Sequence, residues 1–180
     1  MGEPMRLPPL PEDQWGPTER DALAVMLPED RLDPRGAGNA LATLVRHPRL
    51  TRKFLPFSAH LLMRSTLPAR LRELAILRVA RLRDCAYEWA EHLKIAAQAG
   101  LSEDEIEAAG RGEADDALEA AVLAAVDELH RESTVSDRTW AALGEHLSER
   151  QLMDLVFTVG TYSLLAMAFN TFGVEPDKER

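Results

Sequence analysis

Four side chains that can take part in catalysis lie within one stretch of the sequence, residues 73–92. Cys85, the only cysteine, is followed three residues later by Glu88 and seven residues later by His92. On a helix these three side chains share one stripe, because residues three, four and seven positions apart lie on the same face. Glu73 precedes them on a separate predicted helix, and an antiparallel helix pair would bring it back to that stripe. A thiol, two carboxyl groups and an imidazole in one place can support nucleophilic or acid–base chemistry.

The same pattern also has a purely structural explanation. Cysteine is among the most buried residue types and often only fills space. Glu88 and His92 are four positions apart, which is the spacing of an ordinary side-chain pair on a helix. Spacing alone therefore leaves a catalytic site and a buried structural cluster as alternatives.

Two predicted helices must position these side chains. Pro68 suits the first turn of one helix, with Ser65 or Thr66 as its cap. The apolar face of that helix is broad enough to lie in the core and includes Leu71, Leu74, Ile76, Leu77, Val79 and Leu82. We expect Asp84 to cap the next helix. Cys85 would then lie in its first turn, where the helix dipole and the unpaired N–H groups favour a thiolate.

The rest of the chain has the patterns of helices. Ala and Leu are abundant, aromatic residues make up only 6% of the sequence, and no stretch alternates with a period of two for long enough to indicate a strand. We predict an all-α single-domain bundle of eight or nine helices, over residues 17–27, 39–47, 48–63, 68–82, 85–99, 103–109, 115–132, 136–147 and 149–172. The last of these is apolar on almost every side, which places it at the centre of the domain or at a subunit interface.

Proline and polar residues define the ends of the predicted domain. Residues 1–16 contain Pro4, Pro8, Pro9 and Pro11, so we predict an extended or disordered arm with Trp15 as its anchor. The single domain is predicted over residues 17–175, with a frayed tail over residues 176–180.

The charge balance argues against several functional classes. A net charge of −9 and a pI near 5.1 argue against a nucleic-acid-binding surface, which needs a basic face.

Cysteine content and apolar segments indicate the location. One cysteine cannot form an internal disulfide. The N-terminus lacks the apolar segment of a signal peptide, and polar residues interrupt residues 152–172, so neither a signal peptide nor a membrane span is expected. We therefore expect a cytoplasmic protein.

The residues around the stripe resemble a known family. The segment LPARLRELAILRVARLRDCAYEWAEHLKIAAQAGL, residues 67–101, is similar to the carboxymuconolactone decarboxylase-like family, which includes the alkylhydroperoxidase D proteins. The similarity extends from about residue 47 to residue 175. It implies an all-α bundle of the alkylhydroperoxidase D type that assembles as a homo-oligomer.

One departure from the family pattern matters for the chemistry. The alkylhydroperoxidase pattern is a glutamate followed by Cys-x-x-Cys-x-x-x-His, with the reactive thiol at the second cysteine. Glu73 matches the glutamate, Cys85 the first cysteine and His92 the histidine. Glu88 occupies the second cysteine position, so an internal dithiol cycle is impossible. A peroxidase of this kind would have to use Cys85 alone, through a sulfenic acid and an external thiol reductant.

The sequence supports three hypotheses about function. The first is an enzyme that acts on a small cyclic or carboxylated metabolite by acid–base chemistry at Glu73, Glu88 and His92. The second is a thiol-dependent peroxidase or redox sensor that uses Cys85. The third is a non-catalytic helical oligomer in which the stripe is merely buried.

Two aromatic residues and the ligand requirements complete the predicted site. Tyr87 and Trp89 flank Glu88 in a Tyr-Glu-Trp signature that resembles one branch of the family, and we predict that they contact the substrate. We predict no cofactor. We also predict no metal ion, because the sequence supplies no further groups that would hold two carboxylates and an imidazole as metal ligands.

Overall fold

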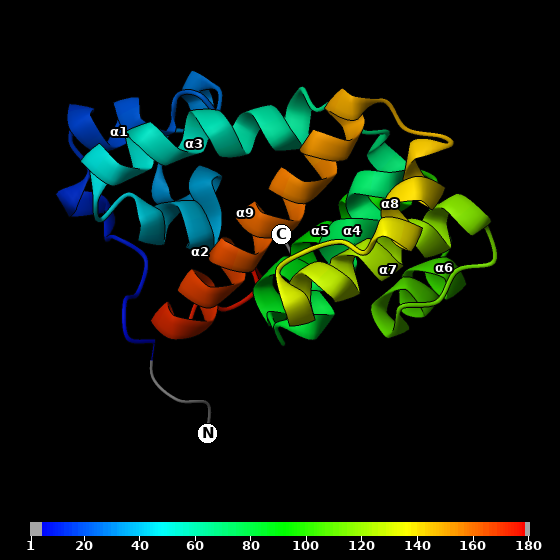
Figure 1. Cartoon of the computed structure of the whole chain (residues 1–180). Coiled ribbons are helices and arrows are strands. Elements are labelled where there is room, and N and C mark those ends of the chain that lie inside the picture. Colours follow the sequence, from blue (N-terminus) through cyan, green and yellow to red (C-terminus); the bar gives the residue numbers. More distant parts are fainter. Residues whose placement is uncertain (1–4, 179–180) are drawn as a thin grey trace. The chain divides into compact units, whose positions relative to one another are not determined.

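The computed structural model describes residues 5–178, and every regular element in that range is helical (Figure 1). The elements in this range are η1 (Glu12–Gln14), α1 (Pro17–Leu23), η2 (Glu29–Arg31), α2 (Pro34–Leu44), α3 (Pro48–Met63), α4 (Ala69–Leu82), α5 (Ala86–Gln98), α6 (Glu103–Arg111), α7 (Ala117–Glu132), α8 (Asp137–Gly144) and α9 (Glu149–Phe172). The prediction of an all-α fold with eight or nine helices is confirmed by the nine α-helices of the described residues.

The chain forms two compact units. Within the described residues, the first unit comprises residues 5–64 and 168–178, and the second comprises residues 65–167. The prediction of one domain over residues 17–175 stays a prediction. All of the predicted site residues belong to the second unit.

The first unit is built around the pair α1 and α3. Its core contains Leu10, Trp15, Ala22, Leu23, Ala37, Ala42, Val45 and Leu55. The arm that precedes α1 joins this core, since the Leu10 N–H donates to the Ala42 carbonyl at 2.8 Å and Trp15 Nε1 donates to the Leu10 carbonyl at 2.9 Å. Residues 1–4 of the predicted arm, Pro4 among them, lie outside the described residues.

The helix α2 differs from the prediction of a loop over residues 28–38 followed by a helix from Asn39. It begins at Pro34, because the Asp33 carboxylate accepts a hydrogen bond from the Gly36 N–H at 2.7 Å. A left-handed Gly38 (φ 69°) then kinks it. The Asn39 N–H donates to Asp177 Oδ1 at 2.7 Å, so Asp177 contacts the kink of α2. The frayed tail over residues 176–180 stays a prediction. Residues 179–180 of the predicted tail lie outside the described residues.

The helix α4 is central to the second unit and packs against α5, α6 and α7, with α8 on α7 (Figure 1). The buried residues that α4 and α7 contribute include Leu74, Ile76, Leu77, Val79, Val122, Leu123 and Val126. The predicted capping box of α6 is confirmed: Ser102 N–H donates to Glu105 Oε2 at 2.8 Å, and Glu105 N–H donates to Ser102 Oγ at 3.3 Å.

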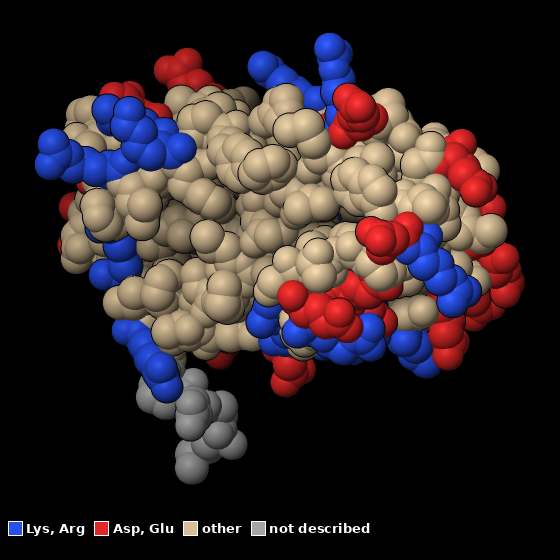
Figure 2. Space-filling view, viewed as in Figure 1, with Lys and Arg blue, Asp and Glu red and all other residues tan. Residues whose placement is uncertain are grey.

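The helix α9 is apolar on both its buried and its exposed side. Leu155, Val159 and Tyr162 are buried, whereas Met153, Phe157, Leu164 and Met167 are about half exposed. Figure 2 shows a surface without charged side chains over the middle of this helix. By length and composition alone α9 could cross a membrane, a test that core helices of water-soluble proteins also pass, and half of its most apolar window is buried within the protein.

Candidate functional site

The turn between α4 and α5 sets the position of the site. Asp84 adopts a left-handed conformation (φ 49°), the Cys85 N–H donates to the Ala80 carbonyl at 2.9 Å, and the Asp84 N–H donates to the Arg81 carbonyl at 3.2 Å. These two bonds form a Schellman motif at the end of α4. Asp84 therefore ends α4 instead of capping α5 as predicted, and Cys85 itself is the residue that precedes the first turn of α5.

Glu73 and His92 form a buried hydrogen-bonded pair between α4 and α5. Glu73 Oε2 lies 2.6 Å from His92 Nδ1, with the Glu73 side chain 0% exposed and the His92 side chain 8% exposed. The other carboxylate oxygen, Oε1, accepts a hydrogen bond from Arg72 Nε at 3.0 Å. Since Nδ1 donates to the carboxylate, Nε2 of the imidazole is left to accept or donate a proton. It has no hydrogen-bond partner among residues 5–178.

Glu88 lies one turn before His92 on α5. Its carboxyl group is buried like that of Glu73 but is not hydrogen-bonded to any described residue. Glu88 is 2% exposed, and neither of its carboxyl oxygens has a hydrogen-bond partner in the part of the chain that the structure describes. Burial without a compensating bond disfavours the charged form. It raises the pKa of Glu88 to about 8, and the nearby Cys85 thiol offsets only part of this rise. Glu88 is therefore mainly a neutral carboxylic acid at pH 7 and can donate a proton.

Cys85 lies beside Glu88 and is also buried. Burial raises the pKa of its thiol to about 11, and the neighbouring Glu88 charge acts in the same direction. The backbone N–H groups of Glu88 and Tyr87 lower that pKa, as the start of a helix should, but burial outweighs them. Burial therefore outweighs the effect of the helix start that favours a thiolate, and the thiol stays protonated at neutral pH. Whether Cys85 reacts stays an open prediction.

Two further residues of this cluster were missed by the sequence interpretation. The Tyr162 ring on α9 meets the His92 ring edge to face, with centroids 5.0 Å apart and an interplanar angle of 87°. Burial raises the pKa of Tyr162, and the negative charge of Glu73 raises it further, so its phenol is neutral. Arg72 holds Glu73 through a guanidinium that is 12% exposed. Two features of the sequence could have indicated them: a tyrosine in a largely apolar helix, and an arginine directly before Glu73.

The two predicted substrate-contacting aromatics have other neighbours in this structure. The Arg81 guanidinium covers one face of the Trp89 ring, 3.5 Å from its centroid. A side chain at Gly110 would approach the same ring to 3.0 Å, so α6 packs closely on Trp89. Tyr87 is half buried on α5. That both residues contact a substrate stays a prediction.

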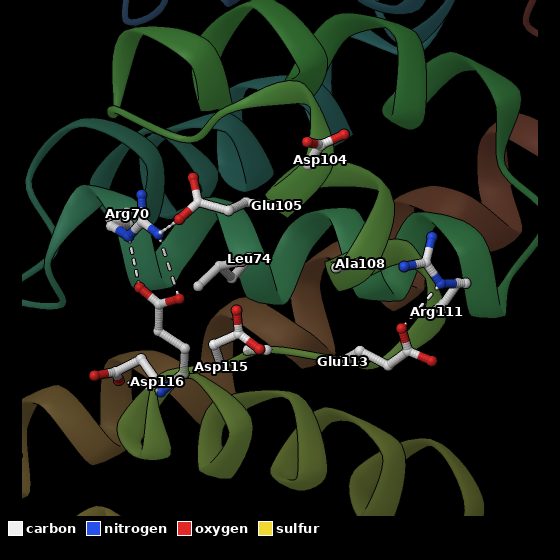
Figure 3. A pocket seen from close by; sticks show the side chains of 11 residues that line it. Arg70, Leu74, Asp104, Glu105, Ala108, Arg111, Glu113, Asp115 and Asp116 are labelled. Atoms are coloured by element: carbon white, nitrogen blue, oxygen red, sulfur yellow. Dashed lines mark hydrogen bonds and ion pairs between the residues drawn. The ribbon is translucent and has the colours of Figure 1, made fainter.

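A cleft lies on another side of α4 and does not include the buried cluster. Its volume is about 690 Å³, and it is lined by residues of α4, α6, the α6–α7 connection and the start of α7 (Figure 3). In this cleft Arg70 binds Glu105 and Glu119 at 2.5 Å each. Within residues 5–178, no group of three His, Cys, Asp or Glu side chains is arranged to hold a metal ion.

Comparisons with known proteins agree with this fold. Residues 48–131 match the family model described as the carboxymuconolactone decarboxylase family. The family resemblance covers just under half of the chain, and the fold is AhpD-like. The match includes all four predicted catalytic residues but ends before α9, which supplies Tyr162. No curated protein sequence matches the chain.

Solved structures share this fold over 74% or more of the chain. A Ralstonia eutropha structure described as an alkylhydroperoxidase AhpD core, an uncharacterized peroxidase-related protein, is 19% identical, with a TM-score of 0.80 over 98% of this chain and 95% of its own. A Silicibacter peroxidase-related protein is 16% identical, with a TM-score of 0.79 and the same coverage of both chains. An Agrobacterium tumefaciens protein of unknown function, described as a candidate antioxidant defence protein AhpD, is 22% identical, with a TM-score of 0.68 over 74% of this chain and 94% of its own. At these identities the likeness establishes the fold.

Proposed function

We propose that this protein is a small-molecule enzyme that uses general acid–base catalysis, with His92 as the base and Glu88 as the acid. The observation that carries this proposal is the pairing of one buried carboxyl group, Glu73, with His92 Nδ1, while the other, Glu88, has no hydrogen-bond partner among the described residues. In this proposal Glu73 orients the imidazole and Glu88 gives up a proton. Two titratable groups whose environments assign them opposite tasks are the usual arrangement for acid–base chemistry.

Each residue has a defined part in the proposed reaction. Glu73 fixes the tautomer of His92 through Nδ1–H and stabilises the imidazolium that forms when Nε2 takes a proton from the substrate. Arg72 holds the second oxygen of Glu73 and keeps that carboxylate in place. Glu88 delivers its proton to the substrate atom that gains negative charge. The proposed substrates are cyclic or carboxylated metabolites, in which loss of a proton or of CO₂ leaves an enolate-like charge.

The test is a comparison of variants on a panel of lactones and other carboxylated carbonyl compounds. His92→Ala and Glu88→Gln should each lower turnover by roughly 10²- to 10⁴-fold, the usual contribution of a positioned acid or base. Glu113→Gln, at an exposed ion pair with Arg111, is the control and should retain wild-type turnover. Turnover that survives both His92→Ala and Glu88→Gln excludes the proposal.

The pH profile gives a second test of the same assignment. The acid must be protonated to act, so kcat/KM should fall as pH rises through about 8, the pKa of Glu88. Glu88→Gln should remove this fall along with most of the activity. A profile that is flat from about pH 7 to pH 9 in the wild type would assign the proton donor elsewhere.

A thiol peroxidase that uses Cys85 is the second candidate. It is supported by the descriptions of the similar structures as peroxidase-related, and it would oxidise the thiol to a sulfenic acid that an external thiol then reduces. The burial of Cys85 weighs against it. With a thiol pKa of about 11, alkylation at pH 8 should be on the order of a few hundred times slower than for a free thiol. Rapid alkylation, or a sulfenic acid after brief peroxide treatment, would move this candidate to first place.

A further inference from the structure

The exposed side of α9 carries a continuous apolar stripe. Five of its large apolar side chains are 37–58% exposed, namely Met153, Val156, Phe157, Leu164 and Met167. All but Val156 recur, with Gly160, at alternating intervals of four and three residues, which places them on one face of the helix. Every charged residue of α9 lies in its first two turns, and the surface over the middle of the helix is uncharged (Figure 2). Single exposed apolar side chains are ordinary, but a continuous stripe of them marks an interaction surface.

Gly160 lies at the middle of this apolar stripe and at the middle of α9. Its surroundings within the chain give no reason for a glycine: it is exposed, and a methyl group at this position would meet no atom of the described residues within 4 Å. A glycine inside a helix is less stable than an alanine. The missing side chain is useful where another backbone approaches closely. Gly160 therefore indicates a helix from outside the chain that crosses α9 at this point.

The apolar stripe is arranged symmetrically about Gly160. Met153 and Met167 each lie seven residues from it, and Phe157 and Leu164 lie three and four residues from it. When two copies of α9 cross antiparallel at Gly160, Met153 of each copy meets Met167 of the other, and Phe157 meets Leu164. A surface that is complementary to itself in this way suits a two-fold dimer, because both subunits then use the same patch.

Charge favours the antiparallel arrangement of two copies. Arg150 lies three residues before Met153 and continues the line of the apolar stripe. A parallel pair would bring two Arg150 guanidinium groups together, whereas an antiparallel pair keeps them at opposite ends of the contact. It also places the positive end of each helix dipole beside the negative end of the other.

The exposed apolar area is what a weak dimer needs. At about half exposure, side chains of this size present on the order of 100 Å² each, so the five present roughly 500 Å² per copy. A pair of copies would bury about 1,000 Å², the lower limit for a specific interface. Such an area predicts a dimer that dissociates on dilution.

We propose that the apolar stripe of α9 binds the same stripe of a second copy, as an antiparallel helix pair that crosses at Gly160. Residues 153–167 all belong to the second unit, so the stripe is complete within that unit. The pairing does not depend on the proposed acid–base function, although the buried side of the same helix carries Tyr162, whose ring contacts His92.

Sedimentation equilibrium of the full chain over a range of concentrations measures the pairing. The wild type should change from a species of 20.0 kDa on dilution to one of at least twice this mass as its concentration rises. Gly160→Leu should raise the dissociation constant by about tenfold or more, because a side chain at a close crossing keeps the two helices apart. Gly160→Ala should weaken pairing less and raise the Tm of the dissociated chain, because alanine favours the helix. Gly144→Ala is the matched control and should pair as the wild type does, since Gly144 is also exposed with open space around an added methyl group.

Disulfide formation tests the orientation of the two helices. The Met153→Cys and Met167→Cys variants, oxidised as a mixture, should form a mixed disulfide, because an antiparallel crossing brings these two positions together. Each variant oxidised alone should form far less. Cys85 is buried and present in every variant, so the wild type oxidised alone gives the background.

Four results would overturn the proposal. They are a wild type that stays at 20.0 kDa at every concentration, a dissociation constant that Gly160→Leu leaves unchanged while circular dichroism shows a native fold, and Met153→Cys that cross-links mainly with itself. The fourth is binding of the wild type to neutral phospholipid vesicles that Leu164→Glu abolishes, which would assign the apolar stripe to a membrane surface instead. If Gly160→Leu does not fold, the dissociation constant of Gly160→Ala decides, and a value equal to that of the wild type counts against the crossing.

Discussion

Carboxyl groups in the second unit occupy two opposite environments, and α4 contributes to both. In the cleft of Figure 3, Glu105 and Glu119 share the Arg70 guanidinium. In the buried cluster, Glu88 is shielded from water and has no hydrogen-bond partner among the described residues. The hydrogen bond from Arg70 lowers the pKa of Glu105 to about 2, whereas burial raises that of Glu88 to about 8.

The contrast shows which carboxyl groups are structural and which are available for chemistry. Glu105 is ionised over the whole physiological range, and its interactions with Arg70 and the Ser102 cap hold α6 on α4. Glu88 can change its protonation near neutral pH, which is what a proton donor must do. A cleft rich in acidic residues is therefore a poorer candidate for acid–base chemistry here than a closed cluster with one unpaired carboxyl.

The largest expected effect is on the pH dependence of stability. The folded-state pKa of Glu88 is about 8, above its ordinary value of 4.5, so the folded state holds the proton that the unfolded chain loses. The free energy of unfolding should therefore fall as pH rises from about 4.5 to 8, by on the order of 5 kcal/mol in total. Chemical denaturation across this range in wild type and Glu88→Gln measures it.

Glu88→Gln removes the ionisable group at nearly constant shape, so its unfolding free energy should vary less over the same pH range. Equal slopes in the two proteins would show that Glu88 is not neutral in the folded state. Glu105 should contribute in the opposite sense, since its lowered pKa stabilises the protein above its ordinary pKa and this contribution is lost as pH falls towards 2.

The second effect concerns the paired carboxylate. Glu73→Gln removes the charge that Arg72 and His92 both contact, and it should cost about 3 kcal/mol because a buried guanidinium loses its partner. Urea denaturation at pH 7 measures this, with Glu107→Gln at the exposed pair with Arg81 as the control, expected to change stability by less than about 1 kcal/mol. A cost as small as that of the control would mean that Glu73 is not a structural ion-pair partner.

The third effect concerns the ion pairs of Arg70 in the solvent-accessible cleft. Arg70→Met should destabilise the protein by roughly 1 kcal/mol, since the Arg70 side chain is 30% exposed and its ion pairs are screened by water. Most of that difference should disappear in about 1 M salt. The cost of Glu73→Gln should persist there, because buried pairs are screened much less. An Arg70→Met cost that is insensitive to salt would contradict this division.

The smallest effect concerns the turn before Cys85. Asp84 has a left-handed backbone conformation although it is not glycine, so Asp84→Gly should stabilise the protein by about 0.5 kcal/mol.

Gly100 occupies the equivalent place in the turn after α5, with φ 88°, and a methyl group at this position would have no neighbour within 4 Å. Gly100→Ala should therefore destabilise by about 1 kcal/mol, through the backbone conformation alone. Thermal denaturation of the two variants measures both shifts, and a Tm decrease for Asp84→Gly would mean that its side chain stabilises the turn.

Local sequence signals predicted most helix boundaries correctly. The helices α3 and α9 begin and end at the predicted residues, and the caps at Ser102 and Ser136 are present. These signals act within a few residues, so the sequence contains everything needed to interpret them. The predicted start of α2 was wrong because Asp33 caps it earlier than expected, and because Asp177, far along the chain, binds the Asn39 N–H at the kink.

The sequence by itself determined which side chains can meet: the spacing of Cys85, Glu88 and His92 places them on one face of α5, and Glu73 lies on the preceding helix. Only the tertiary structure decided which hydrogen-bond partners and which protonation state each of these side chains has. The Glu73–His92 bond, the Tyr162 ring against the imidazole and the absence of any hydrogen-bond partner for Glu88 among the described residues depend on how α4, α5 and α9 pack. Protonation follows from that packing, because burial and hydrogen-bond partners shift a pKa and residue type only sets its starting value.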